Sequence, residues 1–198
     1  EIVSSTSPKA VVTLIQMQSN FGGNHDRVRD FIFSADGDYV IFCSGIWTQK
    51  AAVYSTKTGE FIKTISSDIS SEYTGCSEAA VSPNNGYIAL AQHDEVIAIK
   101  DFRSGASIAR LEAGEDERSF KHIGFSGSGR TFYVATGSDA FSFMGLSEEG
   151  KPHKVDLWNT TDWRKIKTLP GKLESYSNVT DRLLLRDKNG NLKIEKID

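Results

Sequence analysis

The sequence predicts an all-β protein that is built from internal repeats. Four stretches follow one plan, in which an apolar strand leads through a serine and a polar turn into a second apolar strand. The serines are spaced by 48, 44 and 51 residues, and they are Ser34, Ser82, Ser126 and Ser177. Repeats of this length are typical of architectures in which one small sheet stacks on the next.

A second strand–turn–strand element predicts two further strands in each repeat. It occurs at residues 52–65, 97–111 and 155–169, and residues 1–14 align with its first copy without a gap. Apolar and polar residues alternate within it, as they do around Lys63, and this is the periodicity of strands with one buried face. The chain shows no convincing amphipathic helix. Each full repeat is therefore expected to hold four strands.

Four strands joined by tight turns form the blade of a β-propeller, in which blades pack face to face because one small sheet cannot bury both faces alone. Two stretches, "NHDRVRDFIFSADGDYVIFCSG" from Asn24 and "AAVYSTKTGEFIKTI" from Ala51, resemble the WD-repeat β-propeller family. They share with it a His before the first strand, the phrase Phe-Ser-x-Asp-Gly, and Thr-Gly before the last strand. The resemblance covers essentially the whole chain.

The signature residues of that family are replaced at several positions. The family's Trp-Asp pair reads Tyr54-Ser55, Lys100-Asp101 and Trp158-Asn159 in the three repeats. The resemblance implies a buried network of His, Ser or Thr, Asp and Trp, which is complete in no repeat. The residues that match it best are His25 with Ser44, and Asp139 with Trp158.

The repeat alignment divides the chain into about four blades. The expected segments are a blade piece at 1–20, blades at about 21–66, 67–113 and 114–170, and a partial blade at 171–198. The pieces could join, with a strand at 8–15 closing a four-bladed ring. We favour the alternative, a segment of a larger ring whose remaining blades lie in missing sequence or in another chain, because an unclosed stack leaves sheet edges and an apolar face exposed.

Composition and charge exclude several classes of partner. The 198 residues carry a net charge of −3, with 12 basic against 19 acidic residues over 1–150 and 11 against 7 over 151–198. This distribution argues against nucleic acid, which selects a concentrated basic surface. Apolar runs such as "YIALA" at 87–91 are too short to span a membrane. Protein or peptide partners on the blade loops are expected instead.

The cysteines and the chain start predict an intracellular, cytoplasmic protein. Cys43 and Cys76 form no spaced motif, so buried thiols in a reducing compartment are expected rather than a disulfide framework. No basic-then-apolar leader opens the sequence.

Two glycine-containing motifs suggest ligand sites and are better explained as turns. "GFSGSGRT" at 124–131 approaches a phosphate-binding loop, but the following "FYVATG" favours a strand where such a loop needs a helix. Residues 187–195 resemble a calcium loop through Asp187, yet Leu192 stands where a sharp bend needs glycine. Asn189-Gly190 predicts a two-residue hairpin turn with positive φ instead.

Residue patterns for catalysis are absent from the sequence. No histidine pairs with another His or Cys at metal-ligand spacing, and no serine lies in a Gly-x-Ser-x-Gly elbow. We therefore expect no metal, no cofactor and no enzymatic activity.

One segment departs from the repeat. Residues 138–154 occupy a connection that usually needs only a few residues, and long loops in compact domains are usually functional or disordered. The segment contains four apolar residues, which are Phe141, Phe143, Met144 and Leu146. They either cover a neighbouring blade or the axial channel, or they anchor a partner protein, since aromatics and Met dominate such contacts.

The function predicted from the sequence is a non-catalytic scaffold for protein–protein interaction. The alternative is a propeller domain associated with an enzyme, as a hydrolase-gating or ligand-binding ring. Fold alone does not separate the two, because propellers host many functions.

Overall fold

A computed structural model describes residues 28–44, 50–67, 76–92, 96–112, 120–138, 141–143, 146–148 and 150–198 of the chain. All regular elements in these residues are β-strands, as the sequence predicts. None of the described residues forms a helix long and apolar enough to cross a membrane.

The strands form four stacked antiparallel sheets, which we call blades A to D, and one small hairpin. Blade A contains β1 (Val28–Phe33), β2 (Tyr39–Ser44), β3 (Lys50–Ser55) and β4 (Phe61–Ser66) in that order. Blade B contains β5 (Cys76–Val81), β6 (Tyr87–Gln92), β7 (Val96–Asp101) and β8 (Ser107–Glu112). Blade C contains β9 (Phe120–Phe125), β10 (Thr131–Thr136), β13 (Lys154–Asn159) and β14 (Lys165–Pro170). Blade D contains β15 (Lys172–Ser177), β16 (Arg182–Arg186) and β17 (Leu192–Lys196), and the hairpin pairs β11 (Phe141–Phe143) with β12 (Leu146–Glu148).

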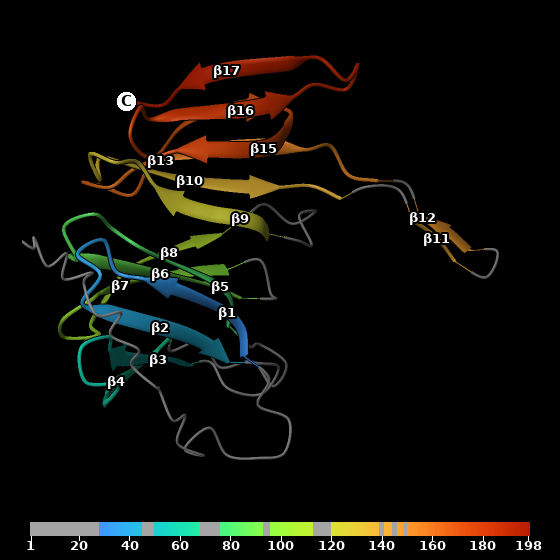
Figure 1. The fold of residues 1–198 in the computed structure, drawn as a ribbon. Helices are drawn as coiled ribbons and strands as arrows, with labels where there is room; N and C mark the ends of the chain where they lie inside the picture. Colours follow the sequence, from blue (N-terminus) through green and yellow to red (C-terminus); the bar gives the residue numbers. More distant parts are fainter. Residues whose placement is uncertain are drawn as a thin grey trace, which may run out of the picture.

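The blades follow one another in chain order from blade A to blade D, as Figure 1 shows. The first strands of blades A and B contact each other, as do those of blades B and C. The fourth strand of each complete blade therefore lies at the far edge of its sheet. This is the predicted arrangement of four-stranded antiparallel blades.

A buried serine closes the turn between the first two strands of blades A, B and C. Its Oγ accepts a hydrogen bond from the backbone N–H of the residue five positions later, where the second strand begins. The pairs are Ser34 with Tyr39, Ser82 with Tyr87 and Ser126 with Thr131, at 3.0, 2.8 and 3.1 Å. The repeated serine is thus a structural requirement of the turn, because a buried backbone N–H needs a partner.

Most of the hydrophobic core lies between the blades in three layers, and a smaller buried cluster of Val40, Ala52 and Tyr54 lies on the other face of blade A. The layer between blades A and B contains Ile41, Val53, Ile88 and Leu90. A second layer between blades B and C contains Ala89, Ile99, Phe125 and Phe132, and a third between blades C and D contains Tyr133, Val155, Leu183 and Leu185. Each inner blade is therefore apolar on both faces, which is why "YIALA" reads as a continuous apolar run.

Each fourth strand carries a β-bulge at an exposed isoleucine. The register shifts where the bulged residue lies, and these residues are Ile62 in β4, Ile108 in β8 and Ile166 in β14. Bulges twist an edge strand and so protect it from pairing with other chains.

Both glycine motifs are turns between strands, as predicted. Gly124 lies in β9 and Thr131 begins β10, so a strand follows the phosphate-loop-like sequence where a helix would be required. At residues 187–191 the Asp187 carboxylate accepts hydrogen bonds from its own turn and closes the β16–β17 hairpin. The predicted two-residue turn is wrong in length, because the Asp187 N–H donates to the Asn191 carbonyl and three residues, 188–190, connect this pair. Of Asn189 and Gly190, only Gly190 has a positive φ.

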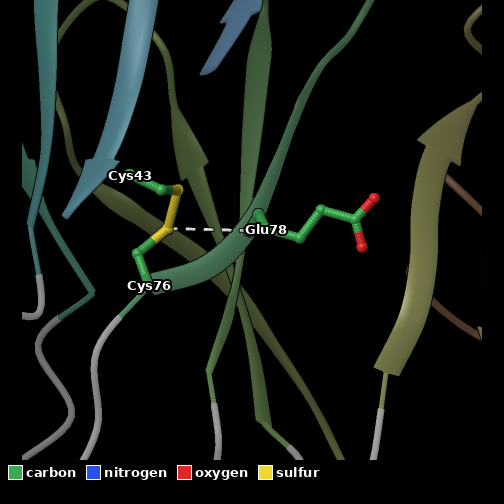
Figure 2. Close-up of a disulfide and its surroundings, with 3 residues drawn as sticks. All are labelled: Cys43, Cys76 and Glu78. Atoms are coloured by element: carbon green, nitrogen blue, oxygen red, sulfur yellow. Dashed lines mark hydrogen bonds between the residues drawn. A yellow bond between two sulfur atoms is a disulfide. The ribbon is translucent and has the colours of Figure 1, made fainter. Parts of the chain in front are cut away.

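Cys43 and Cys76 form a disulfide, which corrects the prediction of free thiols. Cys43 lies in β2 of blade A and Cys76 begins β5 of blade B, so the bond joins two blades (Figure 2). Their Cα atoms are 5.2 Å apart, and both residues are buried. A separation of 33 residues gives no local signal of pairing. Blade packing brings the two cysteines together.

Candidate interaction surface

The connection between the second and third strands is much longer in blade C than in blades A and B. It runs from Ser44 to Lys50 in blade A and from Gln92 to Val96 in blade B, but from Thr136 to Lys154 in blade C. Part of the long connection is a hairpin, because β11 and β12 pair antiparallel with Phe143 opposite Leu146. The predicted oversized loop is therefore partly ordered as strands.

The base of this connection is held closed by backbone contacts. The Ser138 N–H donates to the Lys151 carbonyl at 3.2 Å, and the Lys151 N–H donates to Ser138 Oγ at 3.0 Å. Gly137 has a φ of +127°, and a Cβ there would lie 2.7 Å from the Cα of His153. Only glycine allows the two arms to approach this closely. The point at which the connection leaves the blade is thus fixed.

The hairpin stands away from the four blades in Figure 1. Phe141 and Phe143 lie in β11, Leu146 lies in β12, and Met144 lies outside the described residues. Positions two apart on a strand, and directly opposed positions, share one face of a hairpin. Phe141, Phe143 and Leu146 therefore occupy one face of this element.

The residues matched to the family network are only partly described. His25 and Asp139 lie outside the described residues, and Ser44 ends β2 opposite Val28. Trp158 is half-buried and packs against the core between blades B and C, with the Lys165 ammonium 5.3 Å from the centre of its ring. Within the described ranges the Trp158 indole N–H meets no hydrogen-bond acceptor, and the contribution seen for this side chain is packing.

Blade B has a buried lysine at the position that Trp158 occupies in blade C. Lys100 is fully buried, and its Nζ donates to Ser107 Oγ at 2.7 Å. Tyr54 occupies the equivalent place in blade A, where its ring packs edge-on against Phe42 and Phe61. The repeat thus keeps a large side chain at this position, fully buried in blades A and B and half-buried in blade C, while its chemistry changes.

Polar contacts tie the blades together at the end that carries the serine turns. The Asn85 amide of blade B donates to the Asp36 carboxylate of blade A at 2.6 Å, and the Lys63 ammonium donates to the carbonyls of Phe102 and Arg103. Hydrogen bonds from Ser34 and from the backbone keep the pKa of Asp36 below its ordinary value. Burial lowers the pKa of Lys63. These polar groups join blade A to blade B at this end of the sheets.

The cavity beside these contacts is small. It measures about 150 Å³ and is lined by Tyr39, Lys63, Asn85 and Phe102, among others. Ligand pockets usually measure about 300–1,000 Å³. Among the described residues, no group of three or more His, Cys, Asp or Glu side chains is placed to hold a metal ion.

The contact between His122 and Glu78, which joins two blades, could not be predicted from the sequence. The His122 ring of β9 contacts the Glu78 carboxylate of β5, so blades B and C are also joined near their first strands. The two residues are 44 apart, and only the register of the two blades places them together.

Comparison with known proteins supports the propeller fold. No family model matches the chain, and no curated protein matches it. The chain is similar in structure to the WD40 repeats of RRP9, with a TM-score of 0.63 and 13% identity over 89% of this chain and 50% of that one. It is also similar to Kuenenia stuttgartiensis hydrazine synthase, with a TM-score of 0.62 and 14% identity over 87% of this chain and 46% of that one. The chain spans about half the length of each, and its four-stranded antiparallel sheets fit propeller blades.

Proposed function

We propose that the chain is part of a WD-repeat propeller and acts as a non-catalytic scaffold that binds a protein or peptide. The observation that carries this proposal is the β11–β12 hairpin, which stands away from the blades and places Phe141, Phe143 and Leu146 on one face. Binding residues are commonly found on loops that a rigid framework positions.

The blades supply such a framework. Three apolar layers, a disulfide between blades A and B, and the closed base at Ser138 and Lys151 fix the place from which the hairpin extends. Aromatic and Met side chains carry much of the binding energy in protein interfaces. A partner with an apolar groove fits this hairpin better than a charged ligand does.

Replacing Phe141, Phe143 and Met144 together with serine is expected to abolish partner capture while leaving the unfolding temperature unchanged. Interface anchors cost about 2 kcal/mol or more each when truncated, so a combined loss of at least 100-fold in affinity is expected. Affinity purification from cells, with quantification of co-purified proteins, measures capture, and thermal denaturation measures stability.

Val179→Ser is the matched control for this experiment. Val179 is 89% exposed in a turn of blade D, so its replacement also removes an exposed apolar side chain. It should change neither capture nor unfolding. If the triple variant retains its partners, or if it unfolds several degrees earlier, the residues belong to the core and the proposal fails.

A further inference from the structure

A second cavity between blades A and B lies beside the last two strands of blade B and measures about 290 Å³. Blade A contributes Ser67, which directly follows β4. Blade B contributes residues of β7 and β8, among them Ala98, Lys100, Ser107 and Arg110. The volume is close to the lower limit of ordinary ligand pockets, about 300 Å³. Among the described residues that line this cavity, none carries a carboxylate.

Two basic side chains of blade B line the cavity. Lys100 is 1% exposed, and its Nζ donates to Ser107 Oγ at 2.7 Å. Arg110 lies on the same face of blade B, because its partner across the sheet, Ala98, is two residues from Lys100. The Arg110 guanidinium lies 3.4 Å from the Glu112 carboxylate, but both side chains are more than half exposed, so this ion pair is weak. The lining therefore favours a negatively charged ligand.

The hydroxyl of Ser67 is a further donor, on the blade A side of the cavity. Ser67 is 4% exposed, and its Oγ meets no hydrogen-bond partner in the part of the chain that the structure describes. Buried polar side-chain atoms nearly always have such a partner. A ligand oxygen in the cavity would accept the hydrogen bond of this hydroxyl.

Blade C carries an anion of its own at the equivalent place. Asp156 is the third residue of β13, as Ala98 is of β7, and it is 3% exposed. Its carboxylate accepts hydrogen bonds from Lys165 Nζ, at 2.8 Å, and from the Thr168 hydroxyl. Both donors stand on β14 at positions whose counterparts on β8 line the cavity. Where blade C has a carboxylate, blade B has a methyl group and space beside two basic side chains.

We propose that this cavity binds a tetrahedral oxyanion such as inorganic phosphate, in the place that the Asp156 carboxylate takes in blade C. Lys100 and Arg110 supply positive charge, and charged donors make the strongest hydrogen bonds to phosphate oxygens. The hydroxyls of Ser67 and Ser107 add donors from blade A and blade B. Donors that come from two blades suit an anion with oxygens on all sides better than a carboxylate, which has two. The β11–β12 hairpin takes no part in this site.

Isothermal titration calorimetry of the 198-residue chain with inorganic phosphate, at constant ionic strength, tests this site. One phosphate per chain is expected to bind with a dissociation constant of about 1 mM or lower, since several charge-assisted hydrogen bonds form. Acetate carries a carboxylate and should bind at least about tenfold more weakly, because it leaves part of the donors without a partner.

Ala98→Asp places the carboxylate of blade C in the cavity and should weaken phosphate binding at least about tenfold, because it fills the site and repels the ligand. Arg110→Gln removes an exposed guanidinium and should have a similar effect, so the test stands even if Ala98→Asp does not fold. Arg164→Gln is the matched control, since Arg164 is exposed and also lies beside a carboxylate two residues away.

The control variant should bind phosphate as the wild type does. The proposal is overturned if phosphate shows no saturable binding, if acetate binds as tightly as phosphate, if both cavity variants keep the wild-type affinity, or if the control loses as much affinity as they do. Any of these results leaves the function proposed for the hairpin untouched.

Discussion

Replacing Cys43 and Cys76 with alanine is expected to lower the free energy of unfolding by about 3–4 kcal/mol. The disulfide joins positions 33 residues apart, and closing a loop of that length removes roughly this much conformational freedom from the unfolded chain. Both residues are also buried between blades A and B, so the loss adds a packing defect to the entropy term. Urea denaturation followed by circular dichroism measures the change.

The wild-type chain under reducing conditions is the control for the cysteine variant. Reduction should reproduce most of the destabilisation without any substitution, and the reduced wild type and the variant should then unfold at similar urea concentrations. A variant that loses less than about 1 kcal/mol would contradict the role of this bond between the blades.

The disulfide also bears on where the protein is found. Disulfides persist mainly in oxidising compartments, whereas the expectation of an intracellular location was based on free thiols. The intracellular location stays a prediction. Alkylation of Cys43 and Cys76 in protein taken directly from cells, before any reduction, shows whether the two thiols are free. Free thiols would support a reducing, intracellular compartment, and a disulfide would count against it.

Leu90→Ala is expected to destabilise the chain by about 3–4 kcal/mol, as large-to-small substitutions in well-packed cores do. Leu90 is fully buried in β6 and belongs to the layer between blades A and B. The truncation removes apolar contacts and leaves a cavity that the neighbouring side chains fill only in part. The measurement is the same urea denaturation.

Ile108→Ala serves as the control for Leu90→Ala. Ile108 belongs to the same blade, but it lies at the bulge of β8 and is 46% exposed. Its truncation should cost less than about 1 kcal/mol. Equal effects at the two positions would mean that burial between blades does not hold the fold together.

The repeat could be predicted from the sequence because it has a local physical cause. In blades A, B and C the turn after the first strand needs a buried hydroxyl for an otherwise unsatisfied backbone N–H, so Ser34, Ser82 and Ser126 recur at measurable spacings. The glycine of "GFSGSGRT" at position 129 has a φ of +73°, which explains a glycine in that turn without any phosphate. The alternation of apolar and polar residues predicted the strands on either side of these turns.

Contacts between blades could not be predicted in the same way. The Cys43–Cys76 bond and the Glu78–His122 contact join residues 33 and 44 positions apart. Neither sequence separation predicts a contact unless the register of the two neighbouring blades is known. The oversized connection in blade C was visible as an insertion, but its pairing into β11 and β12 was not, because strands of three residues are too short to show a periodicity.

The most direct test of the account is the thermal unfolding of a chain in which an Asn-Gly turn replaces residues 139–149. The base of the connection at Ser138 and Lys151 stays in place, so the blades should remain intact. We predict an unfolding temperature within about 3 °C of the wild type, which for a chain of this size corresponds to no more than about 1 kcal/mol, together with loss of the captured partner. A shortened chain that unfolds many degrees earlier, or that still captures the partner, would contradict the division between a rigid framework of blades and a binding hairpin.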